Sequence, residues 1–303
     1  MNYNFDEIIN RNGTDSVKWD AVESRWGRND LIPMWVADMD FRTAPFVIEA
    51  LKKRLEHEVL GYTFACKEWS ESIINWVKER HGWVIREEML TFTPGIVRGL
   101  AFVIHCFTQK GDKVIIQPPV YHPFRIVPEK MKREVVYNPL KIVDGVYEMD
   151  FDHLESIIDD KCKVLILCNP HNPGGIVWKK ETLVRLADIC AKHNILVISD
   201  EIHMDMVWSD RPHIPWSNVA RGSWALLTSG SKSFNIPALT GAYGLIEDAQ
   251  SRNDYLSALK GRDGLSSPAV LALSAHIAAY QQGASWLDAL RADSRHHNCR
   301  PSH

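Results

Sequence analysis

Residues 164–200, with the sequence VLILCNPHNPGGIVWKKETLVRLADICAKHNILVISD, contain two short apolar runs separated by a helical pattern. The apolar runs, 164–168 and 196–199, have the length and the β-branched content of buried strands. Residues 180–193 have helical spacing, with one apolar face formed by Leu183, Leu186, Ala187 and Cys190. This order predicts a βαβ unit with a right-handed crossover, and therefore a parallel sheet.

The rest of the chain extends the same pattern. Further apolar runs occur at 114–117 and 226–229, and amphipathic helical patterns at 46–57, 69–80 and 268–281. Alternation of strands and helices predicts an α/β fold, with a mostly parallel sheet between two helical layers. Residues 293–303 have no apolar period, so we expect no regular structure there.

Composition excludes several classes of protein. The 303 residues are 45% hydrophobic and 24% charged, which suits a globular chain with a sizeable core. The formal net charge of −3, without a Lys/Arg-rich run, argues against nucleic acid or a membrane surface as partner. No secretory signal or membrane-spanning run is present, and the six cysteines form no Cys-x-x-Cys pair. We therefore expect a cytoplasmic protein with reduced thiols and no metal site built on cysteine.

Two polar segments follow the strands of the βαβ unit, where open α/β sheets assemble ligand sites. Residues 169–175, Asn-Pro-His-Asn-Pro-Gly-Gly, form a stiff turn that either holds an amide against a flat ligand or only connects strand to helix. The second segment contains the polar residues Asp200, Glu201, His203 and Asp205. The carboxylate of Asp200 is suited to pairing with a cation such as a protonated pyridine. A metal site and a solvated acidic loop are the alternative interpretations of this segment.

A third polar segment, residues 228–233 with the sequence Thr-Ser-Gly-Ser-Lys-Ser, follows the next strand. Small hydroxyl residues and a glycine allow the backbone to close around a phosphate, and a partly neutral Lys232 would form a Schiff base with an aldehyde. The glycine spacing of a P-loop is absent. Ser229-Gly-Ser-Lys232 matches the Ser-x-x-Lys of serine β-lactamases, whose other two motifs are missing.

In combination, these three segments resemble those of the fold-type I enzymes of the aminotransferase class I/II family, which use pyridoxal 5′-phosphate (PLP). Residues 35–41 (Trp-Val-Ala-Asp-Met-Asp-Phe), 118–124 (Pro-Pro-Val-Tyr-His-Pro-Phe), 200–203 and 230–235 resemble more narrowly the MalY/PatB branch of cystathionine β-lyases, and the C-terminal half is especially similar to the MalY type. The resemblance implies a PLP-transferase-like three-layer α/β/α fold with an incomplete small domain.

The resemblance assigns the chemistry to a few positions. Lys232 and Tyr121 would be the catalytic residues: Lys232 would bind PLP covalently and move protons at the substrate, while Tyr121 would stack on the cofactor ring. Asp200 would pair with the pyridinium nitrogen, and Asn172 would hydrogen-bond the ring oxygen. His203, at a position where many aminotransferases have tyrosine, belongs with the cofactor-binding residues.

The resemblance also assigns phosphate and substrate contacts. The phosphate would be held by backbone N–H groups at a helix start and by hydroxyl groups, a set formed by Gly95, Ile96, Val97, Ser229 and Ser231. Tyr62 would reach a phosphate in the neighbouring subunit, which implies a homodimer. Val36 and Ala37 match the segment beside the substrate carboxylate. No metal ion is implied.

The implied reaction is α,β-elimination from cystathionine or a cysteine-like amino acid, giving a thiol, pyruvate and ammonia. Transamination on the same scaffold is the alternative, because both reactions share a carbanion at the substrate Cα. A regulatory role through binding of the maltose activator MalT is a further alternative that the resemblance implies.

The resemblance divides the chain into an N-terminal segment of the small domain (1–45), the large PLP-binding domain (46–284), and the start of the small domain with a tail unlike the family (285–303). Family members continue past the position of residue 303 and supply an arginine for the substrate carboxylate. We therefore expect a truncated chain that binds PLP through Lys232 but has impaired lyase activity.

Overall fold

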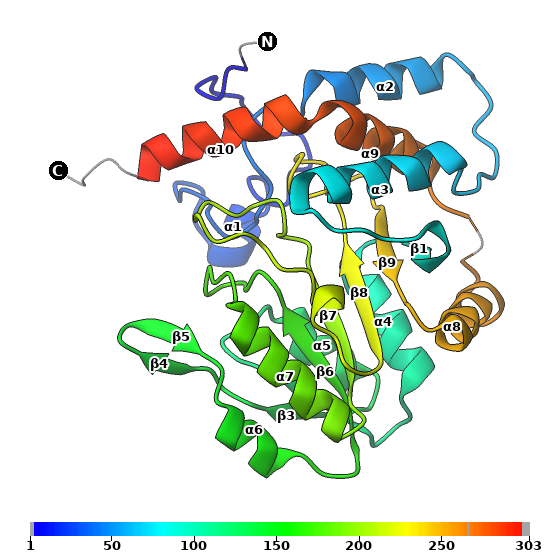
Figure 1. The fold of residues 1–303 in the computed structure, drawn as a ribbon. Helices are drawn as coiled ribbons and strands as arrows, with labels where there is room; N and C mark the ends of the chain where they lie inside the picture. The colour runs from blue at the N-terminus through cyan, green and yellow to red at the C-terminus, as the bar shows by residue number, and fades with distance from the viewer. Residues whose placement is uncertain (1–2, 266, 299–303) are drawn as a thin grey trace.

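In the computed structural model, which describes residues 3–265 and 267–298, a seven-stranded sheet lies between two layers of helices (Figure 1). Its strands follow one another across the sheet in the order β1 (Leu90–Thr93), β9 (Ala242–Leu245), β8 (Trp224–Thr228), β7 (Leu196–Asp200), β6 (Cys162–Cys168), β2 (Lys113–Ile116) and β3 (Glu134–Tyr137). Only β9 runs antiparallel to its neighbours; the other pairs are parallel. The predicted α/β class with a mostly parallel sheet is confirmed.

Apolar side chains on successive residues of the central strands point into two separate cores. In β6, Leu165 and Leu167 belong to one core, while Val164 and Ile166 belong to the other. Each of these four side chains is at most 1% exposed, so each stabilises the fold by roughly 1.5–3 kcal/mol. A parallel sheet needs both faces covered, and the near-continuous apolar run at 164–168 supplies both.

The two cores separate the helices into layers. One core contains residues of α4 (Ile96–Phe107), α5 (Pro123–Lys130) and α8 (Ala249–Gly261). The other contains residues of α2 (Pro45–Leu55), α3 (Lys67–His81), α6 (Phe151–Ile157), α7 (Lys180–Lys192), α9 (Val270–Gln282) and α10 (Ala284–Asn298). Figure 1 shows α7 in front of the sheet and α4 and α5 behind it. None of the helices in the described part of the chain is long and apolar enough to cross a membrane.

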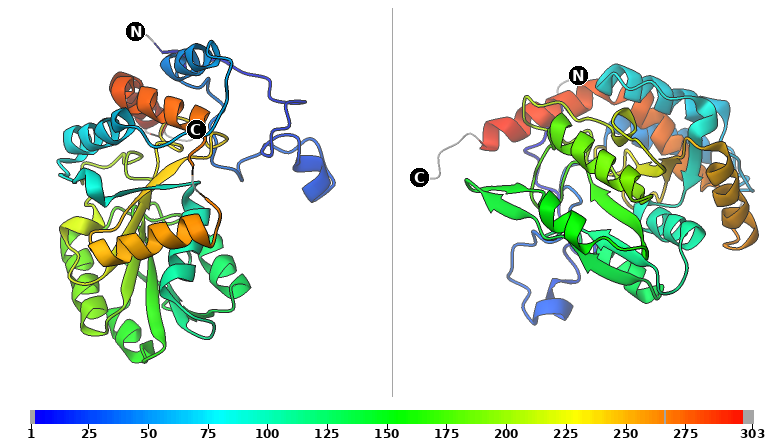
Figure 2. Two further views of the ribbon diagram at one scale, coloured as in Figure 1. Left: turned by 90° about the vertical axis from the view of Figure 1, so that its right-hand side faces the viewer. Right: turned by 60° about the horizontal axis from the view of Figure 1, so that its bottom comes forward.

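Smaller elements lie at the borders of this arrangement. A hairpin of β4 (Lys141–Val143) and β5 (Val146–Glu148) projects from one end of the molecule, and the 3-10 helices η1 (Glu87–Met89) and η2 (Trp216–Asn218) lie in loops. The segment before α2 carries α1 (Val22–Trp26), which stands away from the helical layers (Figure 2).

The end of the chain differs from the sequence-based expectation. Residues 293–298, expected to lack regular structure, continue α10, while 299–303 lie outside the described residues. The first half of α10 is anchored: Leu287 and Leu290 are buried, and Arg80 of α3 forms an ion pair with Asp288 at 2.6 Å. Because extending an existing helix is far easier than starting one, polar residues after this anchored half remain helical.

Candidate active site

The three polar segments meet at the carboxyl edge of the sheet. β6, β7 and β8 are direct neighbours, and the register aligns Cys168 with Asp200 and Asp200 with Leu227. The backbone N–H of Asn169 donates to the carbonyl oxygen of Asp200 at 2.9 Å, so the first two segments begin side by side. The predicted convergence of these segments is therefore present in the fold.

Asp200 is a buried carboxylic acid at the end of β7. Its side chain accepts a hydrogen bond from the backbone N–H of Ile202 at 3.1 Å and, among the described residues, forms no ion pair. Burial, with a smaller contribution from the charge of Glu201, raises its pKa to about 7, and the charge of Lys232 opposes this shift. A buried acid of this kind is poised to pair with an incoming cation.

Lys232 lies in the turn that follows β8 and is half-buried. Burial lowers the pKa of its amine, whereas the negative charges of Asp38 and Asp200 oppose that change. A lysine that loses its proton more easily is a better nucleophile toward a carbonyl group. The structure therefore brings an activated amine and a buried acid together at one edge of the sheet.

Three further predicted residues surround this pair. Burial raises the pKa of the Tyr121 hydroxyl, and the charge of Asp200 raises it further, which places the ring near that acid. Burial lowers the pKa of His203 to about 4, and the charge of Lys232 adds to the effect, so this imidazole is neutral at pH 7. Asn172 lies between β6 and α7 with a half-buried side chain, and its backbone N–H donates to the sulfur of Cys168 at 3.2 Å.

The start of α4 offers free backbone donors. Gly95 has φ of +99°, a conformation that favours glycine, and no side chain caps the helix. An added Cβ at Gly95 would meet no atom within 4 Å, so the backbone there faces open space. Ile96 is buried and Val97 is partly exposed, and the first backbone N–H groups of a helix have no partner within that helix. Such a helix start is suited to an anion.

The two predicted serine ligands differ in their environment. Ser229 Oγ lies 2.8 Å from the Gly241 carbonyl oxygen and 3.1 Å from His276 Nε2, and it accepts a hydrogen bond from the backbone N–H of Ser231. Because His276 Nδ1 faces the carbonyl oxygen of Ala272, its proton sits there, and burial, which lowers the His276 pKa, keeps the ring neutral. The single hydroxyl proton of Ser229 is thus shared between two protein acceptors. The hydroxyl group would have to rotate away from them to donate to a phosphate.

The remaining predicted residues lie farther out. Val36 is half-buried and Ala37 is exposed, immediately before Asp38, whose charge acts on Lys232. The ring of Tyr62 is fully exposed and therefore makes no contact with Lys232, Asp200 or Tyr121. The structure thus brings the 36–37 segment to the site but leaves Tyr62 facing outward.

Asn235 is a residue whose role sequence reasoning missed. It has a positive φ of 55°, its side-chain oxygen accepts from the backbone N–H of Met39 at 2.9 Å, and its amide donates to the carbonyl oxygens of Met39 and Phe41 at 3.0 and 3.1 Å. It therefore joins the Lys232 turn to the segment that carries Val36 and Ala37. The only signal was its place in the Ser-Lys-Ser-Phe-Asn run, which gave no role.

Two acidic side chains of the segment after β7, those of Glu201 and Asp205, point in different directions. Glu201 points into the core, where it accepts hydrogen bonds from Ser199, from the backbone N–H of Trp216 at 2.8 Å, and pairs with His213 Nε2 at 2.7 Å. Asp205 points toward α3 instead. Within the described residues, no group of three or more His, Cys, Asp and Glu is arranged to hold a metal ion. Glu201 organises the loop that ends at η2.

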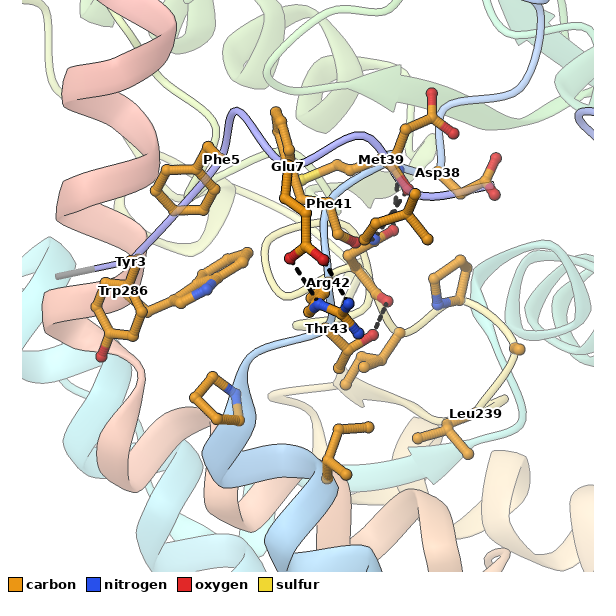
Figure 3. A pocket seen from close by; sticks show the side chains of 18 of the residues that line it. Tyr3, Phe5, Glu7, Asp38, Met39, Phe41, Arg42, Thr43, Leu239 and Trp286 are labelled. Carbon is orange, nitrogen blue, oxygen red and sulfur yellow. Dashed lines mark hydrogen bonds and ion pairs between the residues drawn. The ribbon is translucent and has the colours of Figure 1, made fainter. Parts of the chain in front are cut away.

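A cleft of about 980 Å³ opens beside the site, between the N-terminal segment and the loop after the Lys232 turn (Figure 3). Asp38 and Asn235 line it, whereas Lys232 and Asp200 do not. Figure 3 shows Arg42 in the cleft, where its Nε donates to Glu7 at 2.8 Å. The cleft therefore adjoins the reactive pair without containing it.

Comparison with known proteins identifies similar chains. A family model described as aminotransferase class I and II matches residues 29–298. Protein MalY of Escherichia coli is 51% identical over 292 residues, which cover 95% of this chain and 75% of that protein. Cystathionine beta-lyase PatB of Bacillus subtilis is 41% identical over 291 residues, with the same two coverages. The chain therefore spans about three quarters of the length of these relatives.

Solved structures agree with this relationship. Cystalysin from Treponema denticola, which contains a pyridoxal 5′-phosphate cofactor, superposes with a TM-score of 0.90 at 34% identity, covering 96% of this chain and 75% of that one. The PLP-bound C-S lyase from Staphylococcus hominis superposes with a TM-score of 0.89 at 35% identity, covering 97% and 74%. The resemblance drawn from sequence motifs is confirmed.

Proposed function

The chain belongs to the aminotransferase class I and II family, and we propose that within it this protein is a PLP-dependent carbon–sulfur β-lyase acting on cystathionine or a similar cysteine-like amino acid. One observation of the structure carries the proposal. A buried acid without an ion-pair partner among the described residues, Asp200, lies beside a lysine whose amine is made less basic by burial, Lys232. The names of the relatives supply the class of reaction.

The residues present fit PLP. A protonated pyridine nitrogen would give Asp200 the cation that its buried carboxylate lacks in the described part of the chain. The uncapped start of α4 at Gly95 would receive the phosphate, and Lys232 would bind the aldehyde carbon. Tyr121 and Asn172 would contact the ring. These donors and charges match the cofactor group by group.

Bound PLP supplies an electron sink for the charge left when a proton leaves the substrate Cα. The residues of the chain do the rest. Lys232 Nζ takes the Cα proton, and its lowered pKa increases the fraction of neutral amine that can accept this proton. Asp200 would pair with the ring nitrogen and hold a positive charge there. Val36 and Ala37 position the substrate carboxylate, and neutral His203 adds no competing cation to the pocket.

With cystathionine, cleavage of the Cβ–S bond consumes one water and yields homocysteine, pyruvate and ammonia. Transamination would instead leave the Cβ–S bond intact and transfer the amino group. Cystathionine beta-lyase PatB is 41% identical to this chain and the C-S lyase of Staphylococcus hominis is 35% identical, whereas an aspartate aminotransferase of Pyrococcus horikoshii is 27% identical and is covered over only 54% of its length. A structure described as a putative aminotransferase from Clostridium difficile is 40% identical. The relatives that carry the name of a lyase favour the lyase, and the products formed decide between the two reactions.

The proposal includes a homodimer. The loop before α3 presents large apolar side chains to solvent: Val59 and Leu60 are about 60% exposed, Phe64 is 78% exposed and Tyr62 is fully exposed. An exposed apolar stretch of this kind marks a protein–protein contact. A second copy would cover it and would bring Tyr62 to the phosphate site of its partner. The domain division at residues 45 and 284, and a role with MalT, stay predictions.

The test is product stoichiometry. The protein is incubated with PLP and cystathionine, and pyruvate, ammonia and thiol are quantified together. We expect the three in equal amounts, and none from a Lys232→Ala variant. A 2-oxo acid that retains sulfur, formed without free thiol, would show an aminotransferase instead. Because the ratio does not depend on the rate, a slow enzyme gives the same answer.

A further inference from the structure

We propose that Asp205 is a positioning residue that holds the Lys232 turn in register with Asp200 through the hydroxyl of Ser233. This inference rests on the proposed function, because it concerns the lysine that would react. It assigns a role to an acid that the sequence offered only as one member of a metal site or a solvated loop.

Asp205 is buried and fully bonded. Ser233 Oγ donates to Asp205 Oδ2 at 2.9 Å, and His81 Nε2 lies 2.8 Å from Oδ1. Trp76 Nε1 approaches both carboxylate oxygens, at 3.2 and 3.3 Å. Burial alone would raise the pKa of Asp205, but the hydrogen bonds from His81, Ser233 and Trp76, with the His81 charge, keep that pKa below its ordinary value. The carboxylate therefore stays ionised and accepts all three donors.

The partners of Asp205 come from two elements. Trp76 and His81 lie in the second half of α3, which is fixed by an apolar face containing Ile73 and Val77, both fully buried. Ser233 directly follows Lys232 in the turn after β8. Asp205 thus joins a rigid helix to the reactive turn. Hydrogen bonds to charged groups are stronger than neutral ones, so the Ser233 contact is a firm tether.

The connection matters because of where Asp205 sits in the chain. It follows Asp200 by five residues, and the loop between them is braced by hydrogen bonds from Met204 N–H to the Glu201 oxygen and from Met206 N–H to the His203 oxygen. The two groups that must face each other, Asp200 and Lys232, belong to separate segments. The Asp205–Ser233 bond ties these segments together one residue from the amine.

The turn has other supports, which allows the tether to be tested without unfolding the protein. Phe234 is fully buried against Trp76, Tyr280 and Trp286, with ring centroids 5.5–6.1 Å apart. The backbone N–H of Phe234 also donates to the carbonyl oxygen of Gly230 at 3.0 Å. Removing the Ser233 hydroxyl should therefore leave the turn folded but make the orientation of the Lys232 side chain less well defined.

The experiment compares Ser233→Ala with a matched control, Ser72→Ala. Ser72 is also a buried serine that donates one hydrogen bond, to the Trp69 carbonyl oxygen at 2.8 Å, but it lies in α3 outside the Asp205 cluster. Ser233→Thr, which keeps the hydroxyl, and Asp205→Asn, which keeps the shape without the charge, complete the series. Urea midpoints measure how far each variant loses stability.

The first readout needs no cofactor. The rate at which acetic anhydride labels Lys232 is measured by mass spectrometry from pH 6 to pH 11 on cofactor-free protein. Because the pKa of Lys232 depends on its placement near Asp200, we expect Ser233→Ala and Asp205→Asn to shift the midpoint of labelling, and Ser72→Ala to leave it unchanged. Ser233→Thr should restore the midpoint.

The second readout is the lyase reaction. We expect Ser233→Ala to lower kcat about tenfold with KM changed less than about threefold, since misdirection of one group affects the reacting complex more than binding. Unchanged labelling and unchanged kcat in Ser233→Ala would overturn the proposal. Equal effects of Ser72→Ala and Ser233→Ala on both readouts would overturn it too. If the wild-type protein takes up no PLP, the proposed function fails, while the labelling series still decides the role of Asp205.

Discussion

Replacing Asp200 by Asn should stabilise the cofactor-free protein while weakening its hold on PLP. Burial raises the pKa of Asp200 from 3.8 to about 7 in the folded chain. An acid whose pKa is raised by folding opposes folding once the unfolded chain ionises it, so its cost grows between about pH 4 and pH 7 and is complete above pH 7. A difference of about three pKa units corresponds to roughly 4 kcal/mol.

The Asn variant keeps the shape of the side chain and the acceptor for the Ile202 N–H, but carries no charge. We therefore expect its free energy of unfolding to exceed that of the wild type by up to about 4 kcal/mol at pH 8, and by less than about 2 kcal/mol at pH 5. Urea unfolding of both cofactor-free proteins across this range gives the difference. An exposed acid, Asp160, changed to Asn serves as the control and should show no such trend.

Adding PLP should make the wild type more stable than the Asp200→Asn variant. The wild type gains stability in proportion to its affinity for the cofactor, whereas the Asn variant lacks the charge that would pair with the ring nitrogen. A variant that is no more stable than wild type at pH 8, or whose advantage is equal at pH 5 and pH 8, would refute the claim that Asp200 is held as a buried, unpaired acid. Equal stabilisation of both proteins by PLP would refute its pairing with the cofactor.

Three other substitutions or labels test the packing. Gly283→Ala should destabilise the protein by at least about 2 kcal/mol, because an added Cβ would lie 2.2 Å from the ring of Phe234; a urea midpoint equal to wild type would contradict this. Asp248→Ala should cost about 1 kcal/mol by removing the cap of α8, where the carboxylate accepts from a backbone N–H at 2.7 Å, and the midpoint of thermal unfolding reports it. Cys168, buried and with its thiol pKa raised by burial, should react with a disulfide reagent far more slowly than half-buried Cys66; equal rates in peptide mapping would show that the site core opens.

Much of the fold follows from local sequence pattern. The apolar runs at 164–168 and 196–199 became β6 and β7, and the helical face between them became α7, because period and length alone distinguish buried strands from an amphipathic helix. The predicted strands also placed Asp200 and Lys232 at the same edge of the sheet, because the carboxyl ends of parallel strands share one edge.

Long-range polar contacts could not be predicted from local sequence pattern. The bonds from Asn235 to the segment 39–41 and from Asp205 to His81 join residues more than 120 positions apart, and no local pattern encodes them. The hydroxyl direction of Ser229 depends on His276, which lies on a helix 47 residues away. The helical end of α10 was missed because residues 293–298 have no apolar period of their own and continue a helix whose first half is anchored by Leu287, Leu290 and the Arg80–Asp288 ion pair.

The most direct test of the central claim is to find where PLP becomes attached. Purified protein is incubated with PLP, reduced with borohydride, digested and mapped by mass spectrometry. We expect one pyridoxyl group per chain, on the peptide that contains Lys232, and its loss in Lys232→Ala. Labelling spread over surface lysines, or undiminished in that variant, would contradict it.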